Sequence, residues 1–286
     1  MRILLTGGTG YIGSSVLDTL IASGHDVVAV VRSGDAGDRV RALGASAIQG
    51  DVTDAAWFGA ALDDVDAAIH TAAPDSGAEA FNTAVVDTVI ERFGGTAKRF
   101  VLTSGIWAYG SRAAIDDDGP LDVPELVAWR VPIEERLLAS SVDATIVVPG
   151  VVYGHDRGLG GLVTDAPRTE TGALRLIGDG SQHWTWVHVD DLARLYELAV
   201  TDARARGRLI GSDGSPTTVR ALAEAVAGPA GVVAESVDAS RGRLGGAFTD
   251  ALLLDQAADG AKARALGWAP EYTSIIEELR PEASAA

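Results

Sequence analysis

The sequence predicts an α/β protein, a doubly wound parallel sheet that carries a smaller, discontinuous C-terminal α+β domain. Through the first 150 residues, short β-branched runs alternate with stretches that have apolar residues at helical spacing. A glycine-rich turn follows the first run directly, and after Pro149 the tight connections give way to a looser glycine-rich segment. Because strands separated by helices form βαβ units, the strands are expected to lie parallel in one sheet.

The strands of this sheet are expected at the β-branched runs. They are RILLT (2–6), VVAVV (27–31), SAIQG (46–50), DAAIH (66–70), RFVLT (99–103) and DATIVVP (143–149). Helices are expected from about Ile12, over 83–93 and over 124–140. Pro132 falls within the last pattern, where it either kinks the helix or marks its first turn.

The chain after Pro149 predicts a second, smaller unit. A short strand and a helix are expected over 183–200, with Asp190 as a candidate N-cap, then a helix at 217–228 and a strand at 231–237. We therefore expect a larger domain made of residues 1–152 and 184–207, and a smaller substrate-binding domain made of residues 153–183 and 208–286. The final residues, PEASAA (281–286), are expected to fray.

Composition excludes several classes of function. The chain has 286 residues, of which 47% are hydrophobic, and no cysteine, which excludes disulfides, thiolate catalysis and cysteine-ligated metals. The histidines are scattered, so no metal site is expected. A formal net charge of -17 argues against nucleic acid or an anionic membrane as a partner. The first residues, MRILLTGG, fit neither a secretory signal nor a membrane span, and a cytoplasmic protein is expected.

The segment TGGTGYIG (6–13) carries the strongest functional signal. It follows the first expected strand and opens a helix, which is the context that a dinucleotide fingerprint requires. Gly7 allows the tight turn, Gly10 lets the backbone approach a pyrophosphate, and Gly13 lets the helix pack against the strand. The free amides of the helix N-terminus would then face the phosphates. The segment therefore predicts a Rossmann-type dinucleotide site.

With this motif, the sequence resembles the short-chain dehydrogenase/reductase superfamily, in its extended and atypical branches, which include nucleotide-sugar epimerases and dehydratases. GDVTD (50–54) resembles the segment that contacts adenine, and HTAAP (70–74) resembles the loop that passes the cofactor. VVPGVVYG (147–154) and WVHVDDLA (186–193) fit later landmarks, so the resemblance spans most of residues 1–200. It implies that the cofactor contacts are Gly7, Thr9, Gly10, Tyr11, Ile12, Gly13, Arg32, Ser33, Asp51, Val52, Thr71, Ala72, Ala73, Arg130, Pro149 and Val152.

The residues that follow the second strand bear on which dinucleotide is bound. Arg32 and Ser33 stand where an NAD-preferring relative often has an acidic residue on the ribose hydroxyl. A guanidinium can instead pair with a 2′-phosphate through charge-assisted hydrogen bonds, so NADP(H) is favoured over NAD(H). Asp35 and Asp38 weaken the positive field, which leaves open the alternative that Arg32 is a solvated loop residue.

The same resemblance implies an active site that this chain keeps only in part. In the family, a Ser or Thr after the fifth strand and a Tyr-x-x-x-Lys pair on the next helix carry catalysis. In VLTSGIWAYG (101–110), aligning the Tyr-Gly pair puts Gly105 at the serine position. Its neighbours Thr103 and Ser104 could serve, but adjacent strand residues point to opposite faces, so at most one is expected in the pocket.

The Tyr-x-x-x-Lys pair occurs nowhere in the chain. Registering Glu134 and Leu137 on the family's glutamate and leucine places Arg130 at the lysine slot and Leu126 at the tyrosine slot. Arg130 could hold the ribose or a phosphate, but its high pKa makes it a poor proton shuttle. The candidate proton donor is Tyr109 or ordered water, and the alternative for Tyr109 is a packed aromatic residue whose hydroxyl bonds backbone.

Residues at other strand ends are candidates for substrate contact. Tryptophans on separate segments suggest a flat, apolar or aromatic ligand, with core packing as the alternative. Asn82 falls near the family's asparagine position, or else lies on a helix surface, and His155 either titrates near the cofactor or is a solvated loop residue. Tyr153 matches a family residue that is usually structural. The candidate substrate contacts are Asn82, Trp107, Trp129, Tyr153, His155 and Trp184.

These observations predict an NADP(H)-dependent oxidoreductase of the atypical short-chain type, in which Ser104 or Thr103 orients a substrate oxygen and Arg130 anchors ribose or phosphate. It would reduce a carbonyl or similarly polarised double bond of a small-molecule substrate. Two alternatives stay open: an NAD(P)-dependent nucleotide-sugar epimerase or dehydratase, and a cofactor-binding sensor or scaffold without turnover. The sequence does not fix the oligomeric state, and helices 83–93 and 124–140 could form the face of a homodimer.

Overall fold

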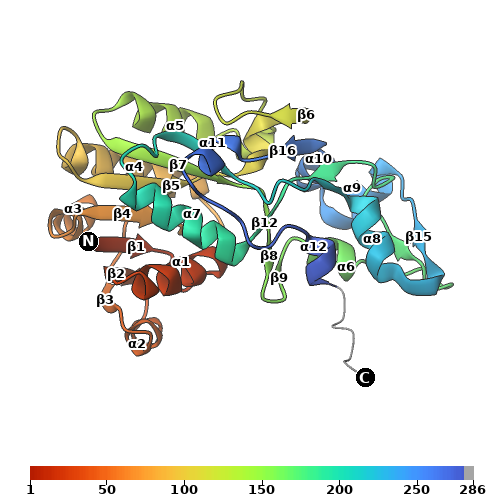
Figure 1. Ribbon diagram of the computed structural model, residues 1–286, viewed down its shortest axis with the longest axis horizontal. Helices are drawn as coiled ribbons and strands as arrows, with labels where there is room; N and C mark the ends of the chain where they lie inside the picture. Colours follow the sequence, from red (N-terminus) through yellow and green to blue (C-terminus); the bar gives the residue numbers. More distant parts are fainter. Residues whose placement is uncertain (280–286) are drawn as a thin grey trace.

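The runs predicted as strands pair into one seven-stranded sheet in the computed structural model, which describes residues 1–279 (Figure 1). The spatial order is β13-β7-β5-β4-β1-β2-β3, and neighbouring strands are parallel throughout. The strands are β1 (Arg2–Thr6), β2 (Asp26–Val31), β3 (Ser46–Gln49), β4 (Ala67–His70), β5 (Arg99–Thr103), β7 (Asp143–Pro149) and β13 (Gly207–Gly211). The predicted fold class is confirmed.

Helices cover both faces of this sheet, as its apolar strands require, because a parallel sheet is buried on both sides. On one face lie α1 (Tyr11–Ala22), α2 (Gly34–Ala42) and α7 (Val189–Thr201), and on the other lie α3 (Ala55–Asp63), α4 (Ala78–Phe93) and α5 (Arg130–Ala139) (Figure 1). Fully buried side chains fill both faces, among them Leu17, Leu195 and Phe93.

The strand order places a ligand crevice at the centre of the sheet. β1 pairs with β2 on one side and with β4 on the other. The strand order therefore reverses at β1, with β2 and β3 on one side and β4, β5, β7 and β13 on the other. The loops that follow β1 and β4 therefore leave the carboxyl edge toward opposite faces. In open α/β sheets, this is the point where ligands bind.

The helix predicted over 124–140 is interrupted. A 3-10 turn, η2 (Glu125–Val127), precedes α5, which begins at Arg130. Pro132 therefore lies in the first turn of α5, where its missing N–H would have no partner within the helix. This break brings the N-terminus of α5 to the carboxyl edge of the sheet.

Short strands and helices form the smaller part of the molecule, which lies at the end opposite the N-terminus (Figure 1). Its sheets pair β8 (Val151–Gly154) with β9 (Arg157–Gly158) and β12 (Trp186–His188), β11 (His183–Trp184) with β14 (Thr217–Thr218), β10 (Leu174–Arg175) with β15 (Val232–Val233), and β6 (Arg112–Ile115) with β16 (Gln256–Ala258). Its helical elements are α6 (Gly161–Thr164), α8 (Val219–Ala227), η3 (Gly228–Ala230), α9 (Val237–Leu244), α10 (Gly246–Leu252) and α12 (Ile275–Glu278). Two further elements, η1 (Ile106–Tyr109) and α11 (Ala261–Ala265), pack against the large sheet.

Two details of the second half differ from the expectations. Residues 208–211, assigned above to the smaller domain, lie in β13, the edge strand that pairs with β7, so the boundary expected after residue 207 cuts through a strand of the large sheet. The N-cap of α7 is His188 and not Asp190, because Nδ1 of His188 accepts a hydrogen bond from the Asp190 amide at 3.2 Å. The predicted fraying of 281–286 lies outside the described residues. Within residues 1–279, no helix has the length and apolarity needed to span a bilayer.

Candidate cofactor and substrate site

The loop between β1 and α1 is shaped to receive a phosphate-bearing ligand. Gly7 has φ +79°, and a Cβ there would lie 2.6 Å from the backbone nitrogen of Ala72, so only glycine fits. A Cβ on Gly13 would overlap the carbonyl oxygen of Gly7. Gly10 is the N-cap of α1 and offers no side-chain acceptor, which leaves the first amides of the helix to a ligand. These features fit a dinucleotide pyrophosphate.

Tyr11 joins this loop to the smaller part of the molecule. Its hydroxyl donates to the carbonyl oxygens of Gly154 at 2.9 Å and Arg157 at 3.2 Å, both on the hairpin of β8 and β9. The Arg157 guanidinium lies 4.8 Å from the centre of the Tyr11 ring. Burial raises the pKa of Tyr11 above its ordinary value. The side chain therefore fastens the hairpin to the start of α1, while the neighbouring Thr9 is exposed.

Arg32 and Ser33 lie just after β2, at the same carboxyl edge. Arg32 is exposed, and its guanidinium has no hydrogen-bond acceptor among the described residues. Ser33 caps α2, because its Oγ accepts from the Ala36 amide at 3.3 Å. Arg32 is thus available to an anionic ligand, whereas the Ser33 hydroxyl already has a structural hydrogen bond.

The other predicted cofactor contacts lie after β3 and β4. The Asp51 carboxylate accepts from the hydroxyl of Thr53 at 2.7 Å and from its amide at 2.8 Å, which holds the pKa of Asp51 below its usual range. Val52 is buried in the core. Thr71 donates to the carbonyl oxygen of Thr6 at 2.8 Å, which fixes the start of the loop that continues through Ala72 and Ala73 beside Gly7.

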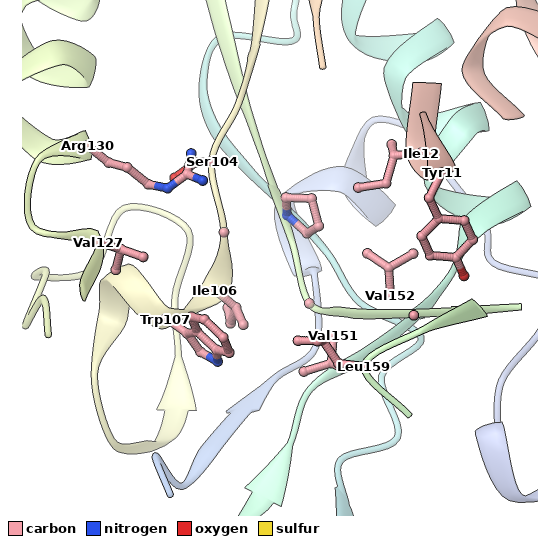
Figure 2. Close-up of a pocket in the computed structure, with 14 residues that line it drawn as sticks. Tyr11, Ile12, Ser104, Ile106, Trp107, Val127, Arg130, Val151, Val152 and Leu159 are labelled. Atoms are coloured by element: carbon pink, nitrogen blue, oxygen red, sulfur yellow. The ribbon is translucent and has the colours of Figure 1, made fainter. Parts of the chain in front are cut away.

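A pocket of about 380 Å³ opens next to the start of α1 (Figure 2). It lies between the end of β5, the start of α5 and the connection from β7 to β8. Six residues singled out from the sequence as catalytic or cofactor contacts line it, namely Tyr11, Ile12, Ser104, Arg130, Pro149 and Val152, together with Trp107 from the substrate set. In Figure 2, Ser104 and Arg130 occupy one wall, and Tyr11, Ile12 and Val152 the opposite one.

Thr103 and Ser104 point in different directions, as expected for neighbours on a strand. Thr103 donates to the carbonyl oxygen of His70 at 2.7 Å, and its hydroxyl lies 2.7 Å from the hydroxyl of Tyr196 on α7. It does not line the pocket, so its inclusion among the catalytic candidates is not supported. Ser104, which is 6% exposed, is the one that reaches the pocket wall.

Ser104 is the first member of a buried polar chain. Its hydroxyl donates to Oε1 of Glu134 at 2.5 Å, and Oε2 of Glu134 accepts from Nη2 of Arg208 at 3.0 Å and from Nε at 3.2 Å. Glu134 is 1% exposed, so its charge depends on this pair and on the hydroxyl for compensation. These hydrogen bonds fix the rotamer of Ser104 and direct its hydroxyl proton toward Glu134.

Arg130 supplies the cation of the pocket. Its Nη1 donates to the carbonyl oxygen of Thr103 at 3.2 Å, and its guanidinium lies 4.5 Å from the centre of the Trp129 ring. Burial lowers the pKa of Arg130 from its ordinary value, although a guanidinium remains charged at neutral pH. Leu126, placed above at the tyrosine slot, is exposed and does not line the pocket.

Tyr109 lies away from the pocket. Its side chain is fully buried, its hydroxyl donates to the carbonyl oxygen of Asp117 at 2.6 Å, and burial raises its pKa well above the ordinary value. The 3-10 turn η1 rotates this side chain into the core beneath the strand end. The proposed role as proton donor is therefore not supported, and the alternative of a packed aromatic residue with a backbone hydrogen bond describes its position.

Trp107 and Trp129 are the substrate candidates that lie at the pocket. Trp107 lines the wall, with its ring edge-on to Phe248 at a centroid distance of 6.0 Å. Trp129 lies behind Arg130 and does not line the wall itself. Of the tryptophans expected to converge, Trp107 alone lines the pocket, and Trp129 reaches it only through its contact with Arg130.

The remaining substrate candidates lie elsewhere, so their predicted role is not supported. Asn82 is buried in α4 and donates to the Ala78 carbonyl oxygen at 2.8 Å. Tyr153 packs against Trp186 in the core, and Trp184 donates through Nε1 to the Leu252 carbonyl oxygen at 2.9 Å. His155 is exposed, and its Nε2 lies 2.9 Å from Oδ1 of Asp190.

The structure adds residues that the sequence analysis did not count among the candidate site residues. Glu134 and Arg208 hold Ser104, and the pocket is also lined by Ile106, Val127, Gly150, Val151, Gly158 and Leu159. A signal existed for Glu134, because it shares a helix face with the apolar Leu137, where a charged residue is unusual. No local signal marks Arg208, whose partner lies 74 residues away along the chain.

Gly105 leaves part of the pocket open at the position where the family has serine. Its backbone is extended, with φ -172° and ψ 149°, which any residue can adopt. A Cβ built there meets no heavy atom within 4 Å. The missing side chain is therefore replaced by space and not by another group.

Comparison with known proteins agrees with this geometry. Residues 7–175 match a protein-family model described as NAD(P)H-binding. A 3-diazoavenalumate denitrifying reductase from Streptomyces sp is 31% identical over 99% of this chain and 100% of its own length. A 2-alkyl-3-oxoalkanoate reductase from Stenotrophomonas maltophilia is 28% identical over 78% of this chain and 73% of its own.

A solved structure shows the same fold. The human epimerase family protein SDR39U1, crystallised with NADPH, superposes with a TM-score of 0.77 at 22% identity, covering 97% of this chain and 98% of its own. Both the glycine loop and the smaller C-terminal part therefore fall within the compared region.

Proposed function

Because this chain belongs to the NAD(P)H-binding family of atypical short-chain dehydrogenase/reductases, we propose that it is an NADPH-dependent reductase of a carbonyl or related polarised double bond in a small, largely apolar substrate. The observation that carries the proposal is one pocket with the start of α1 on one wall and Ser104 with Arg130 on the other. A bound nicotinamide nucleotide would supply hydride there. Relatives described as reductases support the same reaction class.

The walls of the pocket favour a small apolar substrate. Ile106, Trp107, Val127, Val151 and Leu159 form most of its surface. Such a lining stabilises hydrocarbon or aromatic groups, and with Arg130 as the one cation among the described lining residues it offers little compensation for the diphosphate of a nucleotide sugar. The reductase is therefore preferred to the nucleotide-sugar epimerase or dehydratase.

Arg32 supports the choice of NADPH over NADH. It is exposed at the end of β2, and its charge has no acceptor among residues 1–279, so a 2′-phosphate could pair with it. Asp38 forms an ion pair with Arg41 at 2.9 Å, so its carboxylate repels a nearby phosphate less than an unpaired carboxylate would. We propose that Arg32 selects the phosphorylated cofactor.

A titration with NADPH and NADH tests this assignment, with energy transfer from tryptophan to the reduced nicotinamide as the signal. Arg32→Ala should weaken NADPH binding by about 10- to 100-fold, the value of a charge-assisted hydrogen bond, and leave NADH binding unchanged. Arg39→Ala removes an exposed cation from α2 and is the matched control. Equal losses for both nucleotides would refute the selective role, and failure to bind either would refute the cofactor assignment.

An acceptor screen then separates the proposed reductase from its alternatives. Oxidation of NADPH by a carbonyl or conjugated acceptor supports the reductase. A purified protein that retains oxidised cofactor would instead support an epimerase or dehydratase. Binding of NADPH without oxidation by any acceptor would support a sensor or scaffold.

A further inference from the structure

The polar wall of the pocket presents Ser104 as a hydrogen-bond acceptor. Its only proton is donated to Glu134, and Glu134 cannot donate in return, because its other oxygen is paired with Arg208. Rotating the Ser104 hydroxyl toward a ligand would leave a buried carboxylate oxygen without its donor, which is unfavourable. The lone pairs of Ser104 therefore face the pocket, and its proton does not.

Arg130 has the opposite character. One N–H is used by the Thr103 carbonyl oxygen, and the guanidinium has further donors but no acceptor. The face of the guanidinium is covered by Trp129, which leaves its edge directed along the wall that Ser104 shares (Figure 2). A negative oxygen in the pocket would thus meet a fixed cation with several donors.

The other proton-bearing side chains on the described walls are poor acids. The Tyr11 hydroxyl is committed to the Gly154 and Arg157 carbonyl oxygens, and burial raises its pKa. The indole N–H of Trp107 donates hydrogen bonds and does not ionise in this range. The pocket, as the described residues form it, therefore stabilises a negative charge without supplying a proton.

We propose that Arg130 is an oxyanion clamp and that the site reduces acceptors whose reduced form is a resonance-stabilised oxyanion, such as quinones and enones. This inference rests on the proposed function, and it names the substrate class. Glu134 is then a positioning residue that keeps Ser104 in its acceptor orientation.

The electron balance of the reaction explains this preference. A reduced nicotinamide would supply two electrons as hydride to the β-carbon of an enone and would itself be oxidised. The former C=C bond becomes single, a new C=C bond forms to the carbonyl carbon, and the charge moves to the oxygen as an enolate. Transfer of hydride to one oxygen of a quinone makes the ring aromatic and leaves the charge on the other oxygen as a phenolate, and an ordinary phenol has a pKa near 10. Arg130 holds either anion until water protonates it. A simple ketone would give an alkoxide, which is far more basic and requires an acid in the site.

An equilibrium measurement tests the clamp without turnover. The probe is 4-nitrophenol, whose ionised form absorbs visible light, titrated with pH in the presence of the protein, with and without NADP⁺. The positive charge of Arg130 should lower the ionisation pKa of the bound phenol by about 1–3 units. Arg130→Met should abolish the shift, and Arg130→Lys should retain part of it.

Two further variants make this test specific. Arg136→Ala removes an exposed cation from the same helix and should leave the shift intact. Ser104→Ala should retain or enlarge the shift, because Ser104 donates nothing to the anion and can accept only from the protonated phenol. A shift that survives in Arg130→Met, or that disappears in Ser104→Ala with melting temperature retained, would overturn the assignment.

A kinetic comparison tests the substrate class with 2-cyclohexen-1-one and cyclohexanone, which differ only in the conjugated double bond, and with menadione as a quinone. The conjugated acceptors should react faster than cyclohexanone by about 100-fold or more, the contribution that a positioned acid ordinarily makes. Equal rates would overturn the inference but uphold the reductase. If no acceptor reacts, the proposed function fails, while the phenol titration still reports on Arg130.

Discussion

Replacement of Gly105 by larger residues should narrow the pocket without disturbing the fold. The backbone at this position is extended, and a Cβ there meets no heavy atom within 4 Å. Gly105→Ala should therefore stabilise the protein by about 0.4–1 kcal/mol, because alanine restricts the unfolded chain more than glycine does. Gly105→Leu extends farther into the pocket and should compete with the substrate for space.

The effect on substrate can be estimated from the volume that leucine takes. Beyond its Cβ, leucine adds carbon atoms that displace about three methylene-sized groups of a substrate, at about 0.8 kcal/mol each. The total, about 2.4 kcal/mol, corresponds to an increase of about 50-fold in KM. Binding of NADPH should change little, because Arg32 and the glycines of the loop do not line the pocket that the leucine enters.

Steady-state kinetics with a conjugated acceptor, NADPH titration and thermal melting of Gly105→Ala and Gly105→Leu measure these quantities together. A rise in KM that follows side-chain size, with little change in NADPH affinity, supports the placement of the substrate beside Gly105. An unchanged KM in Gly105→Leu would show that the substrate lies elsewhere. A loss of stability in Gly105→Ala would show that the space beside the backbone is not open.

Two further substitutions test other parts of the structure. Tyr109→Phe should leave turnover unchanged and lower stability by about 1 kcal/mol, since only the buried bond to the Asp117 carbonyl is lost; a large fall in turnover at unchanged melting temperature would contradict its position. Burial lowers the pKa of His70 to about 4, so the unfolded chain binds the extra proton between that pH and about 6.5, and the free energy of unfolding should fall as the pH falls through this window. Denaturant titrations of wild type and His70→Gln should therefore differ by about 3 kcal/mol more at pH 7 than at pH 4, in favour of wild type, and parallel pH profiles would refute a neutral buried His70.

The sheet and the glycine loop could be predicted because their signals are local. The β-branched runs and the spacing of Gly7, Gly10 and Gly13 record the backbone conformations that these segments must adopt. The strand alternation also predicted that only one of Thr103 and Ser104 would reach the pocket, although not which one.

The catalytic wall could not be predicted to the same extent because it depends on distant contacts. Tyr109 follows a strand end, which favours a site residue, but the turn η1 directs it into the core, and no pattern in the sequence states that rotation. Arg208 reaches Glu134 only because β13 joins the edge of the large sheet. The sequence alone therefore does not indicate that Arg208 and Glu134 lie close together.

The bond from Tyr11 to the hairpin of β8 and β9 has a consequence for the order in which ligands arrive. The same first turn of α1 offers its amides to a pyrophosphate and holds the segment that carries Gly158 and Leu159 of the substrate wall. A nucleotide that orders this turn also orders that wall, so the substrate pocket is complete only after the nucleotide has bound. We therefore expect compulsory-order kinetics, with the nucleotide first on and last off, so that the concentration of free NADPH governs how much of the protein is competent to meet its substrate.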